Sequence, residues 1–370
     1  MTDSRLARQT AERLIGSRAQ LLKFQSLMGF DGFVDQIFQV VDQRQSPTKY
    51  TPFNSMKNFS KRISGASGLS ANFEIVSQAT KFGGNGPIMA FALSTLGAPV
   101  HYVGMLGYPE IHPVFSEFAK RCKVRSIAEP ALTNAFEFSD GKLMFGQHAT
   151  VNEVSWETIK KRLGDTTFRK LWSQSHFIGM VNWTMLPHLS AIWKRLLSDY
   201  MPKKKGPRKL MFFDLADPAK RLDADLHAAL RIIGEFQEYN DIILGLNESE
   251  SKHVAKVLRL KKTPNSPKGN AALAAAIREK LDLHTVVIHP TKYASGADET
   301  GEFHVEGPYT AKPKISTGAG DHFNAGFVIG RLLGLGMPHA LQLATAASGF
   351  YVRHANSPNR EQLVRFLQTL

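Results

Sequence analysis

A glycine-rich turn followed by an aspartate is the part of the sequence best suited to chemistry. Residues 316 to 327 read Ser-Thr-Gly-Ala-Gly-Asp-His-Phe-Asn-Ala-Gly-Phe, and apolar residues recur at helical spacing after Asp321. The pattern predicts a turn that opens a helix. Backbone N–H groups at such a helix start lack intrahelical partners, and the helix dipole favours negative charge there. The amides of Gly318, Ala319 and Gly320 therefore form a candidate binding site for phosphate.

Asp321 is a candidate general base beside this anion site. Its carboxylate is useful there if it takes a proton from a hydroxyl that then attacks the phosphate, a step that a well-placed base accelerates roughly a hundredfold to ten-thousandfold. We expect the helix dipole to stabilise the ionised form of Asp321, which makes it a weak base that takes its proton late. By themselves these residues fit an ordinary helix start with Asp in its first turn equally well.

The composition excludes several classes of protein. The 370 residues are 43% hydrophobic and 21% charged, as in a globular protein long enough for one large α/β domain or two smaller ones. No apolar run reaches the roughly 18 residues that a membrane span needs. The single cysteine, Cys122, fits a reducing compartment, so we expect a cytoplasmic protein with no membrane partner. The net charge of +14 is dispersed, which favours solvated surface residues over a nucleic-acid partner.

Short apolar runs alternate with helical patterns through most of the chain. This alternation predicts an α/β fold with a mostly parallel central sheet covered by helices on both faces. Ligands of such sheets bind at the carboxyl ends of the strands. The predicted strands are Leu27–Phe30, Val100–Gly104, His176–Val181, Leu210–Asp214, Ile242–Gly245 and Thr285–His289. The predicted helices are Pro87–Leu96, Val114–Arg121, Trp156–Arg162, Leu189–Leu197, Leu226–Phe236, Glu248–Leu260, Ala271–Leu281, Asp321–Leu333 and Pro338–Val352.

Two segments interrupt the alternation and predict a small β lid. Residues 36–78 mix short extended runs with small polar residues, and residues 124–147 contain a hairpin pattern around Asp140-Gly141. Residues 1–24 predict an exposed amphipathic helical extension. The expected organisation is thus an extension at 1–24 and one main domain at 25–370, from which the two lid segments project.

Three further motifs lie beside predicted strands. Gly83-Gly84-Asn85 opens a helix, and its glycines let the backbone approach a ligand that a Cβ would block. Asp31 and Asp35 follow the first strand, where a carboxylate can accept hydrogen bonds from two hydroxyls. Asn247 and Glu250 open the helix after the strand at 242–245. Each motif alone has an ordinary structural explanation: helix entry, turn capping or a favoured acidic residue in a first turn.

Together with the turn at 318–321, these motifs resemble those of the ribokinase-like sugar kinases, the PfkB family. The resemblance rests on Thr-Gly-Ala-Gly-Asp followed by Phe-x-Ala-Gly, on the Gly-Gly segment, on Asn-x-x-Glu and on the Asp of the first strand. The motifs follow one another in family order from residue 27 to residue 358. No Walker-type phosphate loop, complete dinucleotide fingerprint or Cys/His metal cluster competes with this interpretation.

The resemblance implies a three-layer α/β/α fold and phosphoryl transfer from ATP, with Mg2+, to a hydroxyl of a small sugar. It implies that Asp321 is the base and that the 318–320 amides hold the transferring group. It also implies a homodimer formed through the lid. The implied substrate-binding residues are Asp35, Asp31, Gly84 and Asn85. The implied nucleotide- and phosphate-binding residues are Asn247, Glu250, Thr317 and Thr345, and Glu250 would hold Mg2+ through water.

The chain departs from the family pattern at three positions. Ile88 stands where the family usually has an Asn that recognises the sugar, and His289-Pro290 replaces a glycine-rich nucleotide loop. Ile315 stands where potassium-activated members carry an acidic residue, so we expect no potassium requirement. The alternatives to a sugar kinase are a nucleoside or vitamin kinase on the same fold, since fold does not fix substrate, and a sugar-binding regulator without turnover.

Overall fold

A large twisted sheet forms the centre of the protein. The computed structural model describes residues 4–201 and 207–370, and within them nine strands pair in the order β14-β13-β12-β11-β10-β9-β1-β5-β6. The strands from β6 to β12 are parallel, whereas β13 and β14 add an antiparallel edge. Their bounds are β1 Ser26–Gly29, β5 Val100–Gly104, β6 Lys123–Ser126, β9 Phe177–Met180, β10 Leu210–Asp214, β11 Asp241–Leu246, β12 Thr285–Ile288, β13 Tyr293–Asp298 and β14 Gly301–Glu306.

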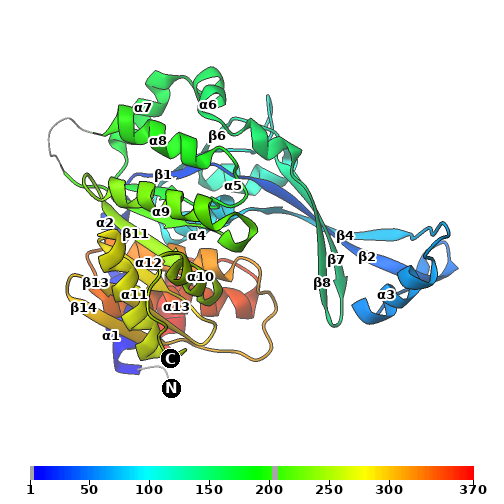
Figure 1. Cartoon of the computed structure of the whole chain (residues 1–370). Helices are drawn as coiled ribbons and strands as arrows, with labels where there is room; N and C mark the ends of the chain where they lie inside the picture. Colours follow the sequence, from blue (N-terminus) through cyan, green and yellow to red (C-terminus); the bar gives the residue numbers. More distant parts are fainter. Residues whose placement is uncertain (1–3, 202–206) are drawn as a thin grey trace.

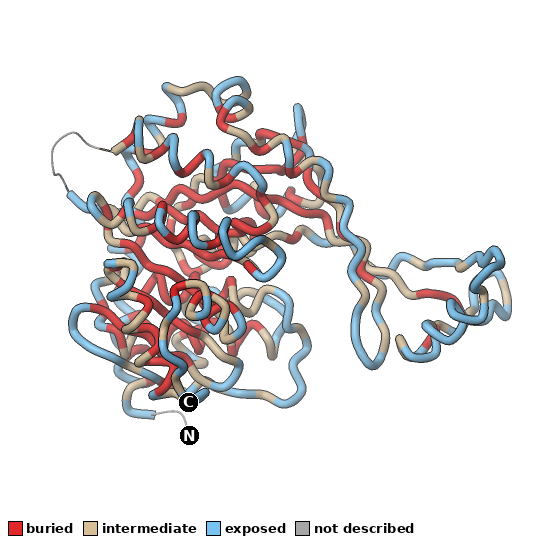
Figure 2. Tube along the Cα trace, in the orientation of Figure 1, coloured by how far each residue is buried: buried red, intermediate tan, exposed pale blue. Residues whose placement is uncertain are grey.

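Helices cover both faces of this sheet. Successive strand residues point to opposite faces, so Phe213 of β10 lies in one core and Phe212 in the other. One face is covered by α6 Trp156–Arg162, α7 Asp165–Gln174, α8 Leu189–Tyr200, α9 Asp223–Phe236, α10 Glu248–Val257 and α11 Pro267–Leu281. The other is covered by α4 Asn85–Leu96, α5 Ser116–Arg121, α12 Ala319–Leu332, α13 Met337–His354 and α14 Arg360–Gln368. Figures 1 and 2 show the resulting layers around a buried central sheet.

The predicted α/β/α fold is confirmed, with differences at the ends of elements. The strands predicted at 100–104 and 210–214 match the structure, and the others shift by one or two residues. The prediction lacked the β13–β14 hairpin, α7 and α14, which are short or amphipathic elements at the edges of the fold. Among the described residues, no helix is long and apolar enough to cross a membrane.

The N-terminal segment packs on the main domain. It forms α1 Ser4–Ile15 and α2 Arg18–Leu21, while residues 1–3 lie outside the described residues. The expectation of an exposed extension is corrected here, because Ala7, Ala11 and Leu14 are fully buried in the same core as α13 and α14. Small residues one helical turn apart give α1 a flat face that fits closely against α14.

A second, smaller sheet projects from the body as the lid. It contains β2 Phe33–Ser46, β3 Lys49–Pro52, β4 Ile75–Gly83, β7 Ala131–Phe138 and β8 Gly141–Gln147, with α3 Met56–Gly65 at its outer end. Figure 1 shows these strands leaving the body together. The long β2 pairs with β4 on one side and with β7 on the other, so both predicted lid segments share one sheet. Residues 123–126, however, form β6 of the large sheet.

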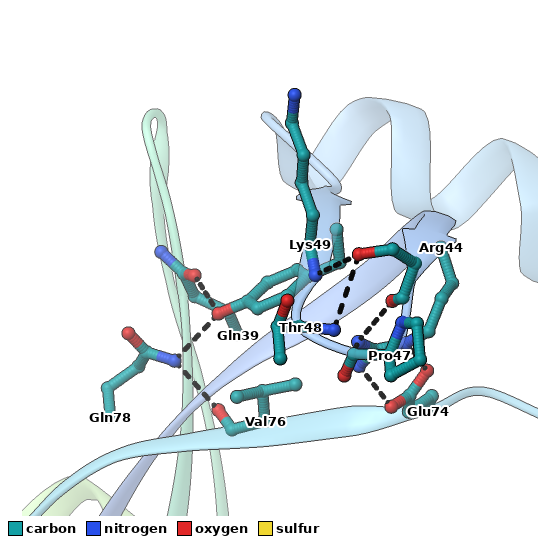
Figure 3. Close-up of polar contacts among 10 residues, drawn as sticks. Gln39, Arg44, Pro47, Thr48, Lys49, Glu74, Val76 and Gln78 are labelled. Carbon is teal, nitrogen blue, oxygen red and sulfur yellow. Dashed lines mark hydrogen bonds and ion pairs between the residues drawn. The ribbon is translucent and has the colours of Figure 1, made fainter.

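Polar contacts between strands add to a cluster of aromatic rings in the outer part of the lid, formed by Phe53, Phe59, Phe73 and Phe138. Gln39 and Gln78 both hydrogen-bond the Tyr50 hydroxyl at 3.0 Å, which ties β2, β3 and β4 together (Figure 3). Arg44 of β2 makes a bidentate ion pair with Glu74, in which the Arg44 Nε donates to Glu74 Oε2 at 2.9 Å. Exposed ion pairs contribute little to stability, so these contacts mainly fix the register of the strands.

Candidate functional site

The predicted anion-binding turn begins α12 as expected. Gly318 has φ = +88°, a left-handed conformation that favours glycine, and it precedes the first helical residue. The amide of Ala319 donates to the Ser316 carbonyl at 3.1 Å, so it is not free in this structure, contrary to expectation. Within the described residues, the amides of Gly318, Gly320 and Asp321 make no hydrogen bond. These three amides are the available anion donors.

Three residues that the sequence interpretation did not single out brace this turn. The His322 ring is 1% exposed, and its two nitrogens lie 2.7 Å from the Gly318 carbonyl and from the Ser357 hydroxyl. The ring stacks on Tyr351 at 3.6 Å between centroids, and the Tyr351 hydroxyl donates to the Thr317 carbonyl at 3.0 Å. Burial lowers the pKa of His322 to about 4, so the ring stays neutral at pH 7.

Asp321 is buried at the start of α12 and is held by one side chain from another helix. The Asn85 amide of α4 donates to its Oδ1 at 3.0 Å. Burial raises the pKa of Asp321 well above its ordinary value, and the charges of Asp214, Asp31 and Glu250 raise it further. The expectation that the helix dipole keeps Asp321 a weak base is therefore wrong, because desolvation and neighbouring carboxylates outweigh the dipole.

Two cavities meet at the turn. A cavity of about 950 Å³ lies between the lid and the body, lined by Asp35, Lys142, Thr317 and His322 among others. A cavity of about 290 Å³ lies on the other side, lined by His289, Ala319, Gly320 and Thr345 among others. Pro313 and Ser316 line both. The turn thus lies between the two cavities, although Asp321 itself, like Gly84 and Asn85, lines neither of them.

Asp35 faces the larger cavity from the lid strand β2. Its carboxylate accepts a hydrogen bond from Thr133 of β7, and the charge of Lys142 lies nearby. Partial burial nevertheless raises its pKa. A Cβ built on Gly83 would lie 2.2 Å from Asp35 Oδ2, so only glycine fits beside the carboxylate. The structure therefore places Asp35 where it can contact a ligand held under the lid.

Asp31 lies deeper, despite its similar place after β1. It is 0% exposed and accepts hydrogen bonds from the Gly86 amide at 3.0 Å, the Tyr102 hydroxyl at 3.2 Å and the Asn182 amide at 2.7 Å. Burial raises its pKa to about 6. Among the described residues that line the two cavities, Asp31 is absent. Tyr102 and Asn182 come from other strand ends, and no local sequence signal links them to Asp31.

Asn247 and Glu250 form a capping box at the start of α10. Asn247 Oδ1 accepts from the Glu250 amide at 3.0 Å, and Glu250 Oε2 accepts from the Asn247 amide at 2.8 Å. Glu250 Oε1 also accepts from the amide of Asp217 at 2.9 Å. Burial and the nearby charge of Asp214 raise the pKa of Glu250 to about 7. Glu250 is thus fixed in place beside a second buried carboxylate.

Asp214 joins the buried carboxylates from the end of β10. It accepts from the Ala216 amide at 2.8 Å and from the Asn324 side chain of α12 at 2.8 Å. Burial raises its pKa to about 6. The charges of Asp214, Asp31 and Glu250 thus all oppose ionisation of Asp321.

Of the four residues predicted to bind nucleotide and phosphate, Thr345 lines the smaller cavity and Thr317 the larger, whereas Asn247 and Glu250 line neither. The smaller cavity is also lined by the His289-Pro290 segment and Gly307–Thr310. His289 stacks against Phe323 with ring centroids 4.7 Å apart, and a Cβ on Gly320 would lie 3.3 Å from its ring. Burial lowers the pKa of His289 to about 4. His289 thus stands where the family resemblance implied a glycine-rich loop.

Solved structures with the same fold include two ribokinases. Ribokinase of Thermotoga maritima matches 93% of this chain and 99% of its own with a TM-score of 0.61 and 16% identity. Ribokinase of Arabidopsis thaliana, solved with ribose and ATP, matches 94% of this chain and 99% of its own with a TM-score of 0.64 and 16% identity. The fold is therefore that of the ribokinase-like carbohydrate kinases.

Comparison of sequences identifies the family. The family model of prokaryotic ketohexokinase matches residues 6–370. A ketohexokinase of Haloferax volcanii is 27% identical over 357 residues, which cover 96% of this chain and 92% of that protein. This chain belongs to the prokaryotic ketohexokinase family, and it is a carbohydrate kinase.

Proposed function

We propose that the protein transfers the γ-phosphoryl group of ATP to a hydroxyl of a ketohexose. One observation carries the mechanism: the turn that holds Asp321 and the free amides of Gly318 and Gly320 lies between two cavities, with Thr317 and His322 lining the one under the lid and Ala319 and Gly320 lining the one beside α13. The similarity to ketohexokinase supports the sugar class, and the fold shared with an ATP complex of ribokinase supports the donor. A transferring phosphoryl group would be positioned and stabilised mainly by fixed N–H donors.

In this mechanism Asp321 takes the proton of the attacking hydroxyl. Its raised pKa makes the ionised form a stronger base than an exposed Asp. Asn85 donates to one carboxylate oxygen and leaves the other available for the acceptor hydroxyl. Gly318 and Gly320 then stabilise the negative charge on the transferring group. The sugar lies in the larger cavity with Asp35 on its hydroxyls, beside Gly84 and Asn85.

The nucleotide lies in the smaller cavity, with Thr345 beside its base and Thr317 near its phosphates. Magnesium neutralises phosphate charge when bound. Among the described residues, no three His, Cys, Asp or Glu side chains form a metal cluster. We propose that Glu250 acts through water, with Asn247 positioning it, because both Glu250 oxygens already accept backbone N–H groups.

We also propose that the lid mediates a homodimer. Its outer strand β8 exposes Met144 by 56% and Phe145 by 57%, which is unusual for two adjacent large apolar residues. Light scattering of the purified chain should give the mass of two copies. A monomer at micromolar concentration would contradict this part of the proposal.

The test is phosphorylation of candidate acceptors by the purified protein with ATP and Mg2+. With a ketohexose such as fructose, ADP should be released and phosphorus NMR should show a sugar monophosphate. The chemical shift and proton coupling of its phosphorus signal should identify the hydroxyl that was phosphorylated. ADP release only with nucleosides would support the alternative class instead. Calorimetric binding of the ketohexose without ADP release would indicate a regulator and overturn the proposal.

A further inference from the structure

A buried hydrogen-bond network connects Asp31 to the proposed base. Asp31 Oδ1 accepts from the Gly86 amide in the first turn of α4, and the preceding residue, Asn85, donates to Asp321 Oδ1. Behind Asp31, the Asn182 amide donates to Oδ2 at 2.7 Å, and the Tyr102 hydroxyl lies 2.7 Å from the Asp31 carbonyl. The contacts thus run without a gap from the ends of β5 and β9 to the start of α12.

The fit around this network is tight. A Cβ on Gly86 would lie 2.3 Å from both Asp31 Oδ1 and the Tyr102 hydroxyl, and one on Gly84 would lie 2.7 Å from Asp31 Oδ2. Two glycines of the α4 entry therefore rest directly on the Asp31 carboxylate. A carboxylate is also favoured at a helix N-terminus because of the helix dipole. The Asp31 carboxylate therefore fixes the distance between the first turn of α4 and β1.

We propose that Asp31 is a positioning residue, which orients Asp321 through the α4 N-terminus and Asn85, whereas Asp35 keeps the sugar-binding role already proposed for it. This inference rests on the proposed function, since it assigns Asp321 the role of base. It separates two aspartates that the sequence treats alike: Asp35 lines the larger cavity, whereas Asp31 is fully buried and lines neither cavity. A displacement of about 1 Å at a reacting group can cost roughly a hundredfold in rate.

The variant Asp31→Asn tests the proposal with little risk to the fold. Asn182 Oδ1 is buried without a hydrogen-bond partner. If the side-chain amide of Asn182 flips by 180°, Asn182 Oδ1 can accept a hydrogen bond from the new amide group at position 31. The hydrogen bond between residues 31 and 182 is then restored. The oxygen at position 31 can still accept from Gly86 and Tyr102. The change therefore removes the charge of Asp31 and weakens its hold on α4 without creating a cavity.

The experiment compares Asp31→Asn with the matched variant Asp35→Asn in the full-length protein. Initial rates with ATP, Mg2+ and fructose give kcat and KM separately. We expect Asp31→Asn to lower kcat at least about tenfold with KM for the sugar within about twofold. We expect Asp35→Asn to raise KM for the sugar at least about tenfold. A raised sugar KM with unchanged kcat in Asp31→Asn would overturn the proposal, as would unchanged values of both.

A second readout separates positioning from general damage. The charges of Asp214, Asp31 and Glu250 face Asp321 and raise its pKa along with burial, so removing the charge of Asp31 should lower it. The acid limb of kcat/KM should then move to lower pH in Asp31→Asn. An acid limb at the wild-type position would contradict the coupling between the two residues.

Tyr102→Phe provides the test if Asp31→Asn fails to fold. It removes one donor to Asp31 and keeps the ring that packs on Phe118 at 5.2 Å. We expect a smaller fall in kcat, with sugar KM unchanged; a rise in KM alone would overturn the proposal. Failure of the proposed function would show differently, as near-normal turnover in Asp321→Asn, whatever the Asp31 and Tyr102 variants do.

Discussion

Asp31→Asn should change the way in which the free energy of unfolding depends on pH. Asp31 is fully buried, and burial raises its pKa to about 6 in the folded protein. In the unfolded chain its pKa is about 3.9. The folded state therefore binds this proton more tightly than the unfolded state does. The associated stability is present below about pH 4 and is lost as the pH rises through the folded pKa of about 6.

The size of the effect follows from the difference between the two pKa values. A shift of about two units corresponds to about 3 kcal/mol over the whole range, of which about 1.4 kcal/mol falls between about pH 5 and about pH 8. Asn does not titrate, so the Asp31→Asn variant does not lose this free energy of unfolding as the pH rises. The difference in unfolding free energy between variant and wild type should move by about 1.4 kcal/mol in favour of the variant over that interval.

Urea denaturation of both proteins without ligands, at several pH values between about 5 and 8, measures this difference. The comparison cancels the contributions of titrating groups that the charge of Asp31 does not influence, provided that the slopes of the unfolding transitions agree. Asp35→Asn is the control, because a half-buried carboxylate at the cavity should show a smaller change. A free-energy difference between Asp31→Asn and wild type that stays constant with pH would refute the assigned charge and burial of Asp31.

Three further perturbations test the turn, the α10 cap and the role of potassium. Gly318→Ala should destabilise the fold by about 1–2 kcal/mol and lower turnover at least about tenfold. The control is Gly334→Ala, which also has a positive φ but has nothing within 4 Å of its added Cβ, and it should retain full turnover. Equal activities of the two variants would contradict the proposed role of the turn. Glu250→Gln leaves the backbone N–H of either Asn247 or Asp217 without its acceptor, so KM for ATP with Mg2+ should rise at least about tenfold. An unchanged KM would remove Glu250 from the site. Replacing sodium by potassium at constant ionic strength should leave turnover within about twofold, because Ile315 cannot ligate an ion, and a several-fold increase would contradict this prediction.

The parts of the protein that depend on local sequence were the most predictable. The parallel strands and most of their helices follow from periodicity, and the α12 start follows from Gly318 and the residues after it. The β13–β14 hairpin was missed because a short antiparallel pair after β12 carries no strong apolar run. The packing of α1 was missed because its amphipathic pattern predicts a helix with one apolar face but does not show what that face packs against.

The parts of the site that depend on distant residues could not be predicted. Asp31 and Asp35 are four residues apart on one stretch, and only the positions of Tyr102 and Asn182 show that Asp31 is enclosed. The raised pKa of Asp321 likewise depends on Asp214, more than a hundred residues away in the sequence. Local patterns indicate which chemistry the residues can do, and the tertiary fold decides which of them face a ligand.

Turnover of Asp321→Asn is the most direct test of the central claim that Asp321 is the base. The Asn side chain keeps the shape of the original and still has an oxygen to accept from Asn85, so calorimetric affinity for ATP should stay within a few-fold of wild type. We expect kcat for ketohexose phosphorylation to fall at least about a hundredfold. A variant that binds nucleotide normally and turns over at a rate near that of wild type would contradict the account.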